Sequence, residues 1–231
     1  MKTKLTLAAS AALLIPCHAA LTISLPGNSE NAVWAGLNNI SYPSSAGYNR
    51  FSTNTSVFNS NPALALLQPG SGSSLGGTFE KISGGGYFAS TSIYNFGVPG
   101  TLKVSDLAAI AALKTVVFQL DMGSALDGVP VLNFNGGSQA LAPNYSATST
   151  GNFISGFSGP PAATVNYAWQ WDLSAVGATS YEIVFTTIAH GTFYQVDLAA
   201  GDSFAQVIPE PSAALFAVAS LALTLSRRRR A

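Results

Sequence analysis

The chain has 231 residues, which is enough for one sizeable domain, and its formal net charge is zero. Six of the ten basic residues lie at the two ends, and the part between Ala20 and Ile208 keeps four cations against nine acids, a net charge of −5. This acidic balance argues against a nucleic-acid partner, because binding phosphates requires clustered Lys and Arg.

The N-terminus has the three parts of a secretory signal peptide. Lys2 and Lys4 form a positive n-region, residues 5–15 form an apolar h-region, and residues 17–20 offer small side chains for cleavage. We predict that residues 1–19 are the signal peptide, so the Sec machinery and signal peptidase are expected partners.

Cleavage after Ala19 fits better than cleavage after Ala20, because the second choice puts the bulky His18 where a small residue is required. The apolar run is too short for the alternative of a membrane helix. Pro16 argues against a lipoprotein with an acylated Cys17, since a small residue is expected before such a cysteine. Removing the signal peptide also removes this cysteine, so no disulfide is expected in the mature chain.

The segment from Leu21 to Gly100 is rich in Ser, Asn, Gly and Thr. Its low charge and many aromatic residues argue against disorder. Alternation predicts a first strand at residues 21–25, and a further strand is expected at residues 87–96. A Gly- and Ser-rich loop is expected at residues 69–77.

One helix is predicted, at residues 106–114. Ser105 precedes it as an N-cap, Asp106 lies in its first turn, and Lys114 lies near its negative end. At about nine residues, this helix is expected to connect strands and not to act as a scaffold.

The second half of the chain is dominated by strand patterns. Alternating or β-branched runs predict strands at residues 116–122, 131–134, 165–173, 181–189, 192–198 and 203–207. The run at 181–189 is nearly all apolar or β-branched, as expected of a strand that is buried on both faces or central in a sandwich. His190 and Gly191 are expected to turn it into a hairpin with the next strand.

Short strands separated by turn signals determine the predicted fold class. Residues 20–206 are expected to form an all-β domain, an antiparallel β-sandwich that is jelly-roll-like, with one short connecting helix.

Residues 72–76 match the G-x-S-x-G nucleophile motif. Such an elbow needs a strand before it, a helix after it and a downstream histidine held by an acid. Here the motif lies in a loop without a helical pattern after it, and His190, the one histidine left after signal removal, lies at a predicted turn. A hydrolase that uses Ser73 or Ser74 with His190 is therefore the least favoured alternative, and no catalytic residue is predicted.

A metal site has little support in the sequence. One histidine and no cysteine exclude the usual zinc sets. Calcium would need several converging oxygens, and the acids available for that are Asp121, Asp127, Asp197 and Asp202. Asp121 and Asp127 flank one loop, but exposed turn acids are the favoured interpretation. We predict no metal and no cofactor.

Tyr167, Trp169 and Trp171 form a row on one face of a predicted strand. An outward row would be a platform on which sugar rings stack, whereas an inward row belongs to the core. The opposite face carries polar residues such as Gln170, so alternation places the aromatic row inside. Trp34 lies in a region without a clear period, and both alternatives stay open for it.

The last segment, residues 207–231, contains three different pieces. Pro209, Glu210 and Pro211 form a stiff element, because two prolines fix φ and remove two backbone donors. Residues 212–226 carry no charge. The arginine cluster then consists of Arg227, Arg228, Arg229 and Arg230. An apolar run closed by arginines is typical of a membrane helix with the arginines on the cytoplasmic side.

This order of Pro-Glu-Pro, short apolar helix and terminal arginines resembles the PEP-CTERM sorting signal of bacterial proteins that are handled by an exosortase. The resemblance covers residues 207–231 alone. It implies that an exosortase acts at or near the Pro-Glu-Pro motif and releases or transfers the domain toward the cell surface and its exopolysaccharide. A helix of about 15 residues spans only about 22 Å, short of a hydrocarbon core of about 30 Å. The segment therefore suits a transient anchor better than the alternative, an ordinary permanent one.

We expect a Gram-negative exported protein that is first an inner-membrane-anchored precursor and then lies at the cell surface or outside the cell. Its domain is expected to have a non-enzymatic structural or adhesive role. The alternative is a carbohydrate-binding module acting on exopolysaccharide. That alternative predicts an exposed aromatic patch, or a groove with Asn, Gln and Asp around it.

Overall fold

The computed structural model of the chain describes residues 23–37, 67–88, 92–95, 97–153 and 162–208. The predicted signal peptide with Ala19 and Ala20, the Pro-Glu-Pro motif, the apolar run and the arginine cluster all lie outside these residues. Within the described residues the regular structure consists of strands, and none of them forms a helix. The prediction of an all-β domain is therefore confirmed.

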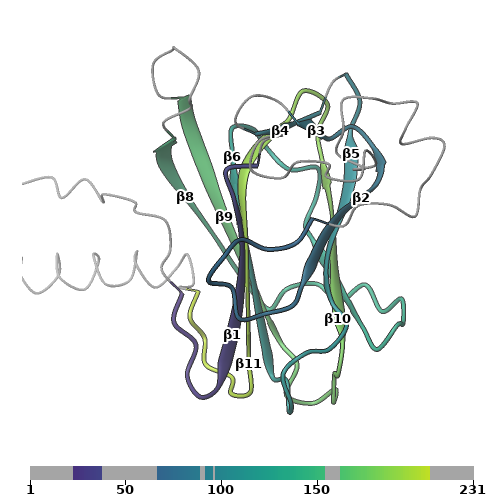
Figure 1. Cartoon of the computed structure of the whole chain (residues 1–231), viewed down its shortest axis with the longest axis vertical. Coiled ribbons are helices and arrows are strands. Elements are labelled where there is room, and N and C mark those ends of the chain that lie inside the picture. The colour runs from purple at the N-terminus through teal and green to yellow at the C-terminus, as the bar shows by residue number, and fades with distance from the viewer. Residues whose placement is uncertain (1–22, 38–66, 89–91, 96, 154–161, 209–231) are drawn as a thin grey trace, which may run out of the picture.

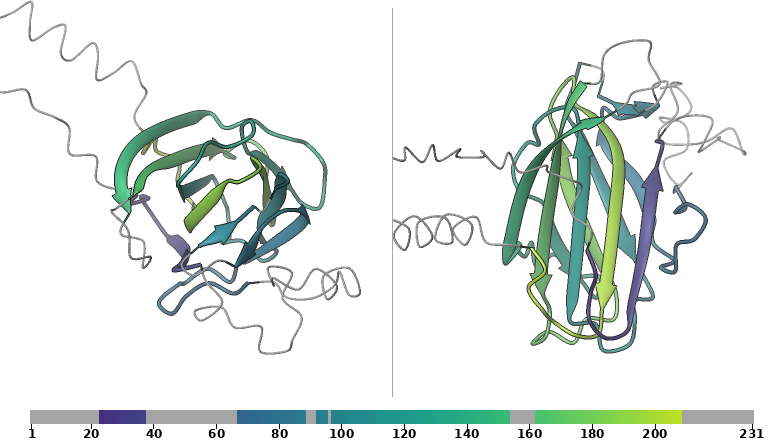
Figure 2. Two further views of the ribbon diagram at one scale, coloured as in Figure 1. Left: turned by 90° about the horizontal axis from the view of Figure 1, so that it is seen from above. Right: turned by 90° about the vertical axis from the view of Figure 1, so that its left-hand side faces the viewer.

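The strands form two antiparallel sheets that face each other, as in a β-sandwich (Figures 1 and 2). The first sheet has seven strands in the order β3-β4-β11-β6-β9-β8, with β1 also paired to β11, and the second has four in the order β2-β5-β10-β7. In chain order the strands are β1 (Ser29–Ala35), β2 (Thr78–Gly84), β3 (Tyr87–Phe88), β4 (Ile93–Tyr94), β5 (Gly100–Asp106), β6 (Thr115–Met122), β7 (Val131–Phe134), β8 (Tyr145–Phe153), β9 (Ala162–Asp172), β10 (Tyr181–Thr187) and β11 (Thr192–Gly201).

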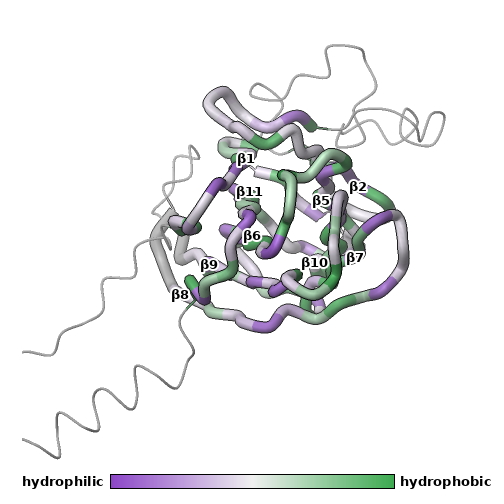
Figure 3. The backbone as a smooth tube through the Cα atoms, turned by 90° about the horizontal axis from the view of Figure 1, so that it is seen from below, coloured by the Kyte–Doolittle hydropathy of each residue, from purple (hydrophilic) through white to green (hydrophobic). Residues whose placement is uncertain are grey.

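The hydrophobic core lies between the two sheets and is rich in aromatic rings. Phe118 of β6 stacks on Trp169 of β9 with 5.7 Å between ring centroids, and it also meets Phe185 of β10 at 5.2 Å. Because β6 and β9 belong to one sheet and β10 to the other, this contact joins the two layers. Figure 3 shows the strands of the two sheets surrounding this interior when the sandwich is seen from below.

A β-bulge in β11 keeps the core face continuous. Phe193 pairs with Met122 and Gln195 pairs with Asp121, so Tyr194 is the extra residue. Phe193 and Val196 are consequently both fully buried, although two residues separate them. Beyond the bulge the odd-numbered side chains of β11 face away from the core, among them Asp197.

A second, smaller apolar cluster covers part of the outer face of the seven-stranded sheet. It contains Leu25, Val117, Ala168 and Ile208, which come from both ends of the described chain and from β6 and β9. The segment after Gly201 returns across the sheet to reach this cluster, so packed residues continue to Ile208.

Gln170 of β9 fastens this returning segment. Its side chain is completely buried, and its amide nitrogen donates to the carbonyl of Ala205 at 2.7 Å and to Oγ1 of Thr115 at 3.1 Å. Its amide oxygen accepts from the backbone N–H groups of Val207 at 3.0 Å and Ile208 at 3.4 Å. The amide thus provides the hydrogen bonds that a neighbouring strand would give.

The predicted helix at residues 106–114 is wrong. Asp106 is instead the last residue of β5 and pairs with Tyr181. Its Oδ1 accepts from the N–H of Ala108 at 3.0 Å, and Ile110 donates its N–H to Glu30 Oε1 at 3.0 Å. Ala112 has a φ of 59°, which a right-handed helix does not allow. Side-chain acceptors and sheet pairing therefore outweigh the helix propensity of the alanines.

Most strands from residue 115 to residue 201 lie where alternation predicts them, and β10 is central in its sheet, as expected. The hairpin at His190 is wrong, because β10 and β11 belong to different sheets and the turn crosses between them. Residues 203–207 are also not a strand, and of the predicted strand at residues 21–25 the described residues 23–25 are not extended in a sheet. The predicted strand at residues 87–96 is divided into the short β3 and β4.

We predict that Gln170→Ala destabilises the domain by about 2–4 kcal/mol, because it leaves the buried or half-buried N–H and C=O groups of residues 205, 207 and 208 without these partners. Urea unfolding of the full chain in mild detergent, followed by tryptophan fluorescence, measures this change. Gln206→Ala is the matched control, since Gln206 is exposed and makes one hydrogen bond, to the carbonyl of Ile208 at 3.1 Å, so its removal should cost no more than about 1 kcal/mol. Equal effects of the two substitutions would contradict the fastening role of Gln170.

Candidate functional site

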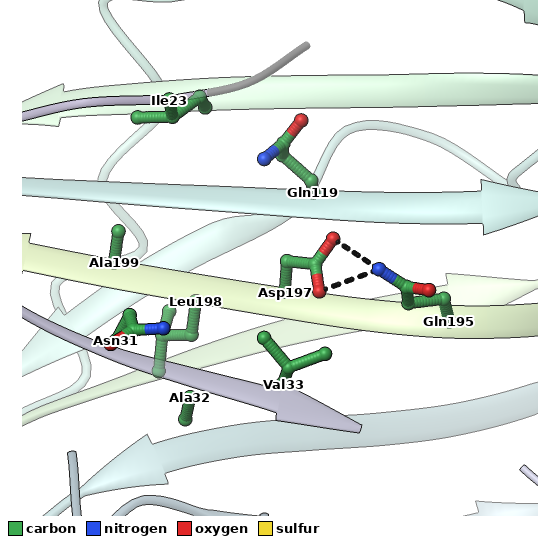
Figure 4. Close-up of a pocket in the computed structure, with 9 residues that line it drawn as sticks. All are labelled: Ile23, Asn31, Ala32, Val33, Gln119, Gln195, Asp197, Leu198 and Ala199. Carbon is green, nitrogen blue, oxygen red and sulfur yellow. Dashed lines mark hydrogen bonds between the residues drawn. The ribbon is translucent and has the colours of Figure 1, made fainter. Parts of the chain in front are cut away.

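A pocket of about 230 Å³ lies over the outward-facing sides of β1, β11 and β6 (Figure 4). Its lining residues are Ile23, Asn31, Ala32, Val33, Gln119, Gln195, Asp197, Leu198 and Ala199. None of these nine described residues is a Lys, Arg or His. The site therefore offers one carboxylate, three amides and an aliphatic surface.

The strand register determines which of these side chains are neighbours. Val33 of β1 is the partner of Asp197 in β11, and Asp197 is in turn the partner of Gln119 in β6. The aspartate therefore lies in the middle of a row across three strands, with an aliphatic side chain on one side and an amide on the other. Asn31 follows on β1, opposite Ala199.

Asp197 is oriented by Gln195, two residues earlier on the same strand and on the same face. The amide nitrogen of Gln195 donates to both carboxylate oxygens, at 2.9 Å and 2.8 Å (Figure 4). Burial raises the pKa of Asp197, the Gln195 hydrogen bond lowers it, and the nearby Asp121 carboxylate raises it, so that together they move it from 3.8 to about 6. Ionisation of Asp197 in the folded protein therefore costs more free energy than ionisation of an exposed aspartate.

Asp121 of β6 lies beside the pocket and adds a second acid. Burial raises the pKa of Asp121, and its hydrogen bond with Thr164 lowers it. Its Oδ1 is buried and has no hydrogen-bond partner among the described residues. The pKa of Tyr194 is raised as well, by burial and then by the Asp121 charge. The outer face therefore concentrates acceptors for hydrogen bonds.

This arrangement suits a small, neutral ligand rich in hydroxyl groups. A carboxylate accepts several hydrogen bonds, while each Asn or Gln amide both donates and accepts. The volume is below the range of about 300–1,000 Å³ that is usual for drug-sized ligands, so the pocket has room for one sugar ring or a group of similar size. An anion would be repelled by Asp197 and Asp121.

The serines of the G-x-S-x-G motif hold the edge of β1. Ser74 Oγ accepts from the N–H of Asn31 at 2.9 Å and donates to its Oδ1 at 3.1 Å. Ser73 Oγ accepts from the N–H of Val33 at 3.2 Å. The motif is followed by β2 and not by a helix, so it lacks the context of a nucleophile elbow.

His190 lies in the turn between β10 and β11, with a φ of 59°. Its Nδ1 shares a hydrogen bond of 2.6 Å with the hydroxyl of Tyr94, and its backbone N–H donates to Asn95. The histidine and the two serines therefore have different hydrogen-bond partners, in different parts of the fold.

The structure brings together two of the four acids that were considered for calcium. Asp121 and Asp197 are close enough for the charge of Asp121 to raise the pKa of Asp197. Asp127 lies exposed after a turn, and Asp202 instead accepts from the backbone and side-chain nitrogens of Asn28 at 3.0 Å and 2.7 Å. Among the described residues, no three His, Cys, Asp or Glu side chains gather in a way that could hold a metal ion.

The aromatic row of β9 belongs to the core, as alternation predicts. Trp169 and Trp171 are buried, and Tyr167 stacks on Trp169 at 5.5 Å and is half-buried. Trp34 is also completely buried, with its indole N–H donating to the carbonyl of Leu67 at 3.1 Å. Of the aromatic side chains whose burial the structure describes, none is fully exposed, and the half-buried Tyr145 and Phe204 stack on each other at 6.2 Å.

The sequence contained part of the signal for this pocket. Alternation in β6 places Gln119 and Asp121 on the face opposite the core, and the structure agrees. The contributions of Asn31, Gln195 and Asp197 could not be predicted, because they depend on the pairing of strands from the two ends of the domain.

No family model matches this chain, and no curated protein or solved structure was found to be similar to it. In the part of the chain that the structure describes, no helix has the length and apolar character needed to cross a bilayer. The predicted C-terminal span lies beyond that part.

We predict that Asp197→Asn changes the pH dependence of stability. The folded-state pKa of Asp197 is raised from 3.8 to about 6. Its ionisation therefore lowers the free energy of unfolding as the pH rises through this window, and the protein stays less stable at higher pH. The variant should gain up to about 3 kcal/mol in free energy of unfolding, relative to the wild type, between pH 4 and pH 7.

Urea unfolding across this pH range tests the prediction. Asp127→Asn, which removes the same charge from an exposed turn, serves as the control. Parallel stability–pH curves for the wild type and Asp197→Asn would show that the acid is not buried as described.

Proposed function

We propose that the protein is an exported component of the Gram-negative cell surface or extracellular matrix, and that its pocket binds a hydroxyl-rich segment of exopolysaccharide. The observation that carries this proposal is the row of Asn31, Gln119, Gln195 and Asp197 around one pocket. The carbohydrate-binding alternative expects a groove with Asn, Gln and Asp around it, and the lining of this pocket supports that alternative. It extends the expected structural or adhesive role by giving the domain a ligand.

Sugar hydroxyl groups are both donors and acceptors, and the pocket is complementary to them. Asp197 accepts, and the amides of Gln119 and Asn31 supply donors and acceptors on either side of it. Val33 and Ile23 provide aliphatic surface against the C–H groups of a ring. Because stacking rings are absent from the described lining, the expected affinity per sugar is low, and it depends on the hydrogen bonds.

We further propose that the domain is not an enzyme. Ser73 and Ser74 use their hydroxyl groups to hold β1, and His190 bonds to Tyr94. These contacts favour structural roles for the three residues that a hydrolase would need.

A jelly-roll-like wrapping is the topology that we infer for the sandwich. Pairs β1·β11, β5·β10 and β6·β9 are nested in the chain, so that early strands pair with late ones in reverse order. This nesting, with the pairs alternating between the two sheets, supports a chain rolled up as one long hairpin. The additional edge strands β2 and β8 would extend that arrangement.

Sorting by an exosortase is the third part of the proposal and rests on residues 207–231. The stiff motif of Pro209, Glu210 and Pro211 follows directly after Ile208, the last buried residue of the described domain. A stalk that begins where packing ends would keep the site of processing close to the membrane. The arginine cluster would hold the short apolar run on the cytoplasmic side until processing.

We predict that exopolysaccharide isolated from the producing host binds the wild-type protein, and that Asp197→Ala weakens this binding by about tenfold or more, because a hydrogen bond to a charged group contributes about 1.5–3 kcal/mol. Gln119→Ala should weaken it as well. Isothermal titration or a glycan array measures both effects. Asp127→Asn is the control that removes a charge elsewhere, and unchanged binding by Asp197→Ala would refute the assignment of the pocket.

We also predict that the exported protein lacks Arg227, Arg228, Arg229 and Arg230, and that its C-terminus lies at or near the Pro-Glu-Pro motif. Glu210→Ala should leave the apolar run attached in most molecules, while Gln206→Ala should be processed normally. Mass spectrometry of protein from a host with an exosortase decides the matter. A membrane-free exported protein that still carries the four arginines would count against processing.

A further inference from the structure

Strand β8 forms an open edge of the seven-stranded sheet. It pairs with β9 along its whole length, from Tyr145 opposite Gln170 to Phe153 opposite Ala162, without a register shift. It is the last strand in the order of this sheet, so one side of its backbone faces no other described strand. In Figure 1 it lies at the outer margin of the sandwich.

Among the described residues, this edge shows none of the usual features that protect against pairing. Soluble proteins usually protect a long edge strand with Lys, Pro, a bulge or a short length. β8 contains no proline and no charged residue, and its pairing has no bulge. The absence of charge extends further, since the sequence has no Asp, Glu, Lys, Arg or His between Asp127 and Asp172. This uncharged stretch includes β7, β8 and most of β9.

The rest of the domain is acidic, with a net charge of −5 between Ala20 and Ile208. Two such molecules carry a net charge of the same sign and repel each other, and an edge without charged side chains adds nothing to that repulsion. Ser146 and Thr148 are exposed on β8. Side chains of this kind form favourable pairs across strands.

We propose that β8 is the self-association edge of this protein, and that two copies pair through it antiparallel about a two-fold axis. The partner is a second copy, because a two-fold axis perpendicular to the sheet places identical strands antiparallel and matches a neutral edge with a neutral edge. The product is one continuous sheet that runs through both molecules. Pairing of the two β8 strands would form main-chain hydrogen bonds between the copies and needs no side-chain pocket.

The proposal is independent of the polysaccharide site. The pocket lies over β1, β11 and β6, while β9 separates β6 from β8 in the sheet order. Pairing at β8 therefore leaves both pockets open, and a dimer would present two of them. Such a dimer would bind a polymer with repeated sugar units more strongly than one domain does.

Sedimentation equilibrium of the full chain in mild detergent tests the proposal. We expect a dimer for the wild type, and a dimer dissociation constant at least about tenfold higher for Thr148→Lys, because charge on an edge strand opposes edge-to-edge pairing. Ser146→Lys should act in the same way. Leu107→Lys adds the same charge at a position that is 81% exposed and far from β8 in sequence, and it should leave the dimer unchanged.

Circular dichroism of each variant verifies that the fold is intact. If one of the two β8 variants fails to fold, the other one provides the test. A wild-type monomer at the highest soluble concentration would overturn the proposal. A dimer that persists unchanged in both β8 variants would also overturn it, because association would then use another surface. Weakening by Leu107→Lys to the same extent would show a general charge effect and no role for the edge.

Discussion

The antiparallel pairing of β1 with β11 is the constraint on which the rest of this structure depends. It joins the first and last strands of the domain over seven consecutive positions, from Ser29 opposite Gly201 to Ala35 opposite Gln195. Strand β11 pairs with β6 on its other side. The pocket therefore depends on the same strand pairing that closes the domain, since Val33 and Gln119 are neighbours of Asp197 only when β11 pairs with both β1 and β6.

The bulge at Tyr194 determines which side chains of β11 face the core and which face outward. Without the extra residue, the side-chain alternation of β11 would not bury both Phe193 and Val196. The same shift decides that Gln195 and Asp197 face outward. One local irregularity thus serves the core on one side of the sheet and the polar pocket on the other.

Asp197 shows that this outer face is not optimised for stability. Its carboxylate is largely buried, its pKa is raised to about 6, and a second acid lies near it. The ion pairs seen among the described residues lie on the other sheet, where Lys103 contacts Glu80 at 2.8 Å and Glu182 at 3.1 Å. Carboxylates with raised pKa values and no cation beside them occur often at functional sites, and this is consistent with the binding role proposed for the pocket.

Sequence reasoning predicted local patterns well and long-range pairing poorly. Alternating or β-branched runs located β6, β7, β9, β10 and β11, and alternation placed Trp169 and Trp171 in the core. It was misled by the alanines before Lys114, where hydrogen bonds to Asp106 and Glu30 hold an irregular segment. It also could not tell a hairpin from a crossover at His190, because a short turn between two strands has the same sequence pattern in both cases.

Gln170 illustrates most clearly why alternation alone does not determine exposure. It lies on the face of β9 opposite the tryptophans, where the pattern predicts contact with water, yet it is completely buried. The face is covered by residues 205–208, which have no regular strand structure of their own. A buried amide is stable only when its donors and acceptors are satisfied, and Gln170 achieves this with four partners from Thr115 and the returning segment. A single polar side chain therefore holds the last described residues of the chain, 205–208, against the outer face of the sheet.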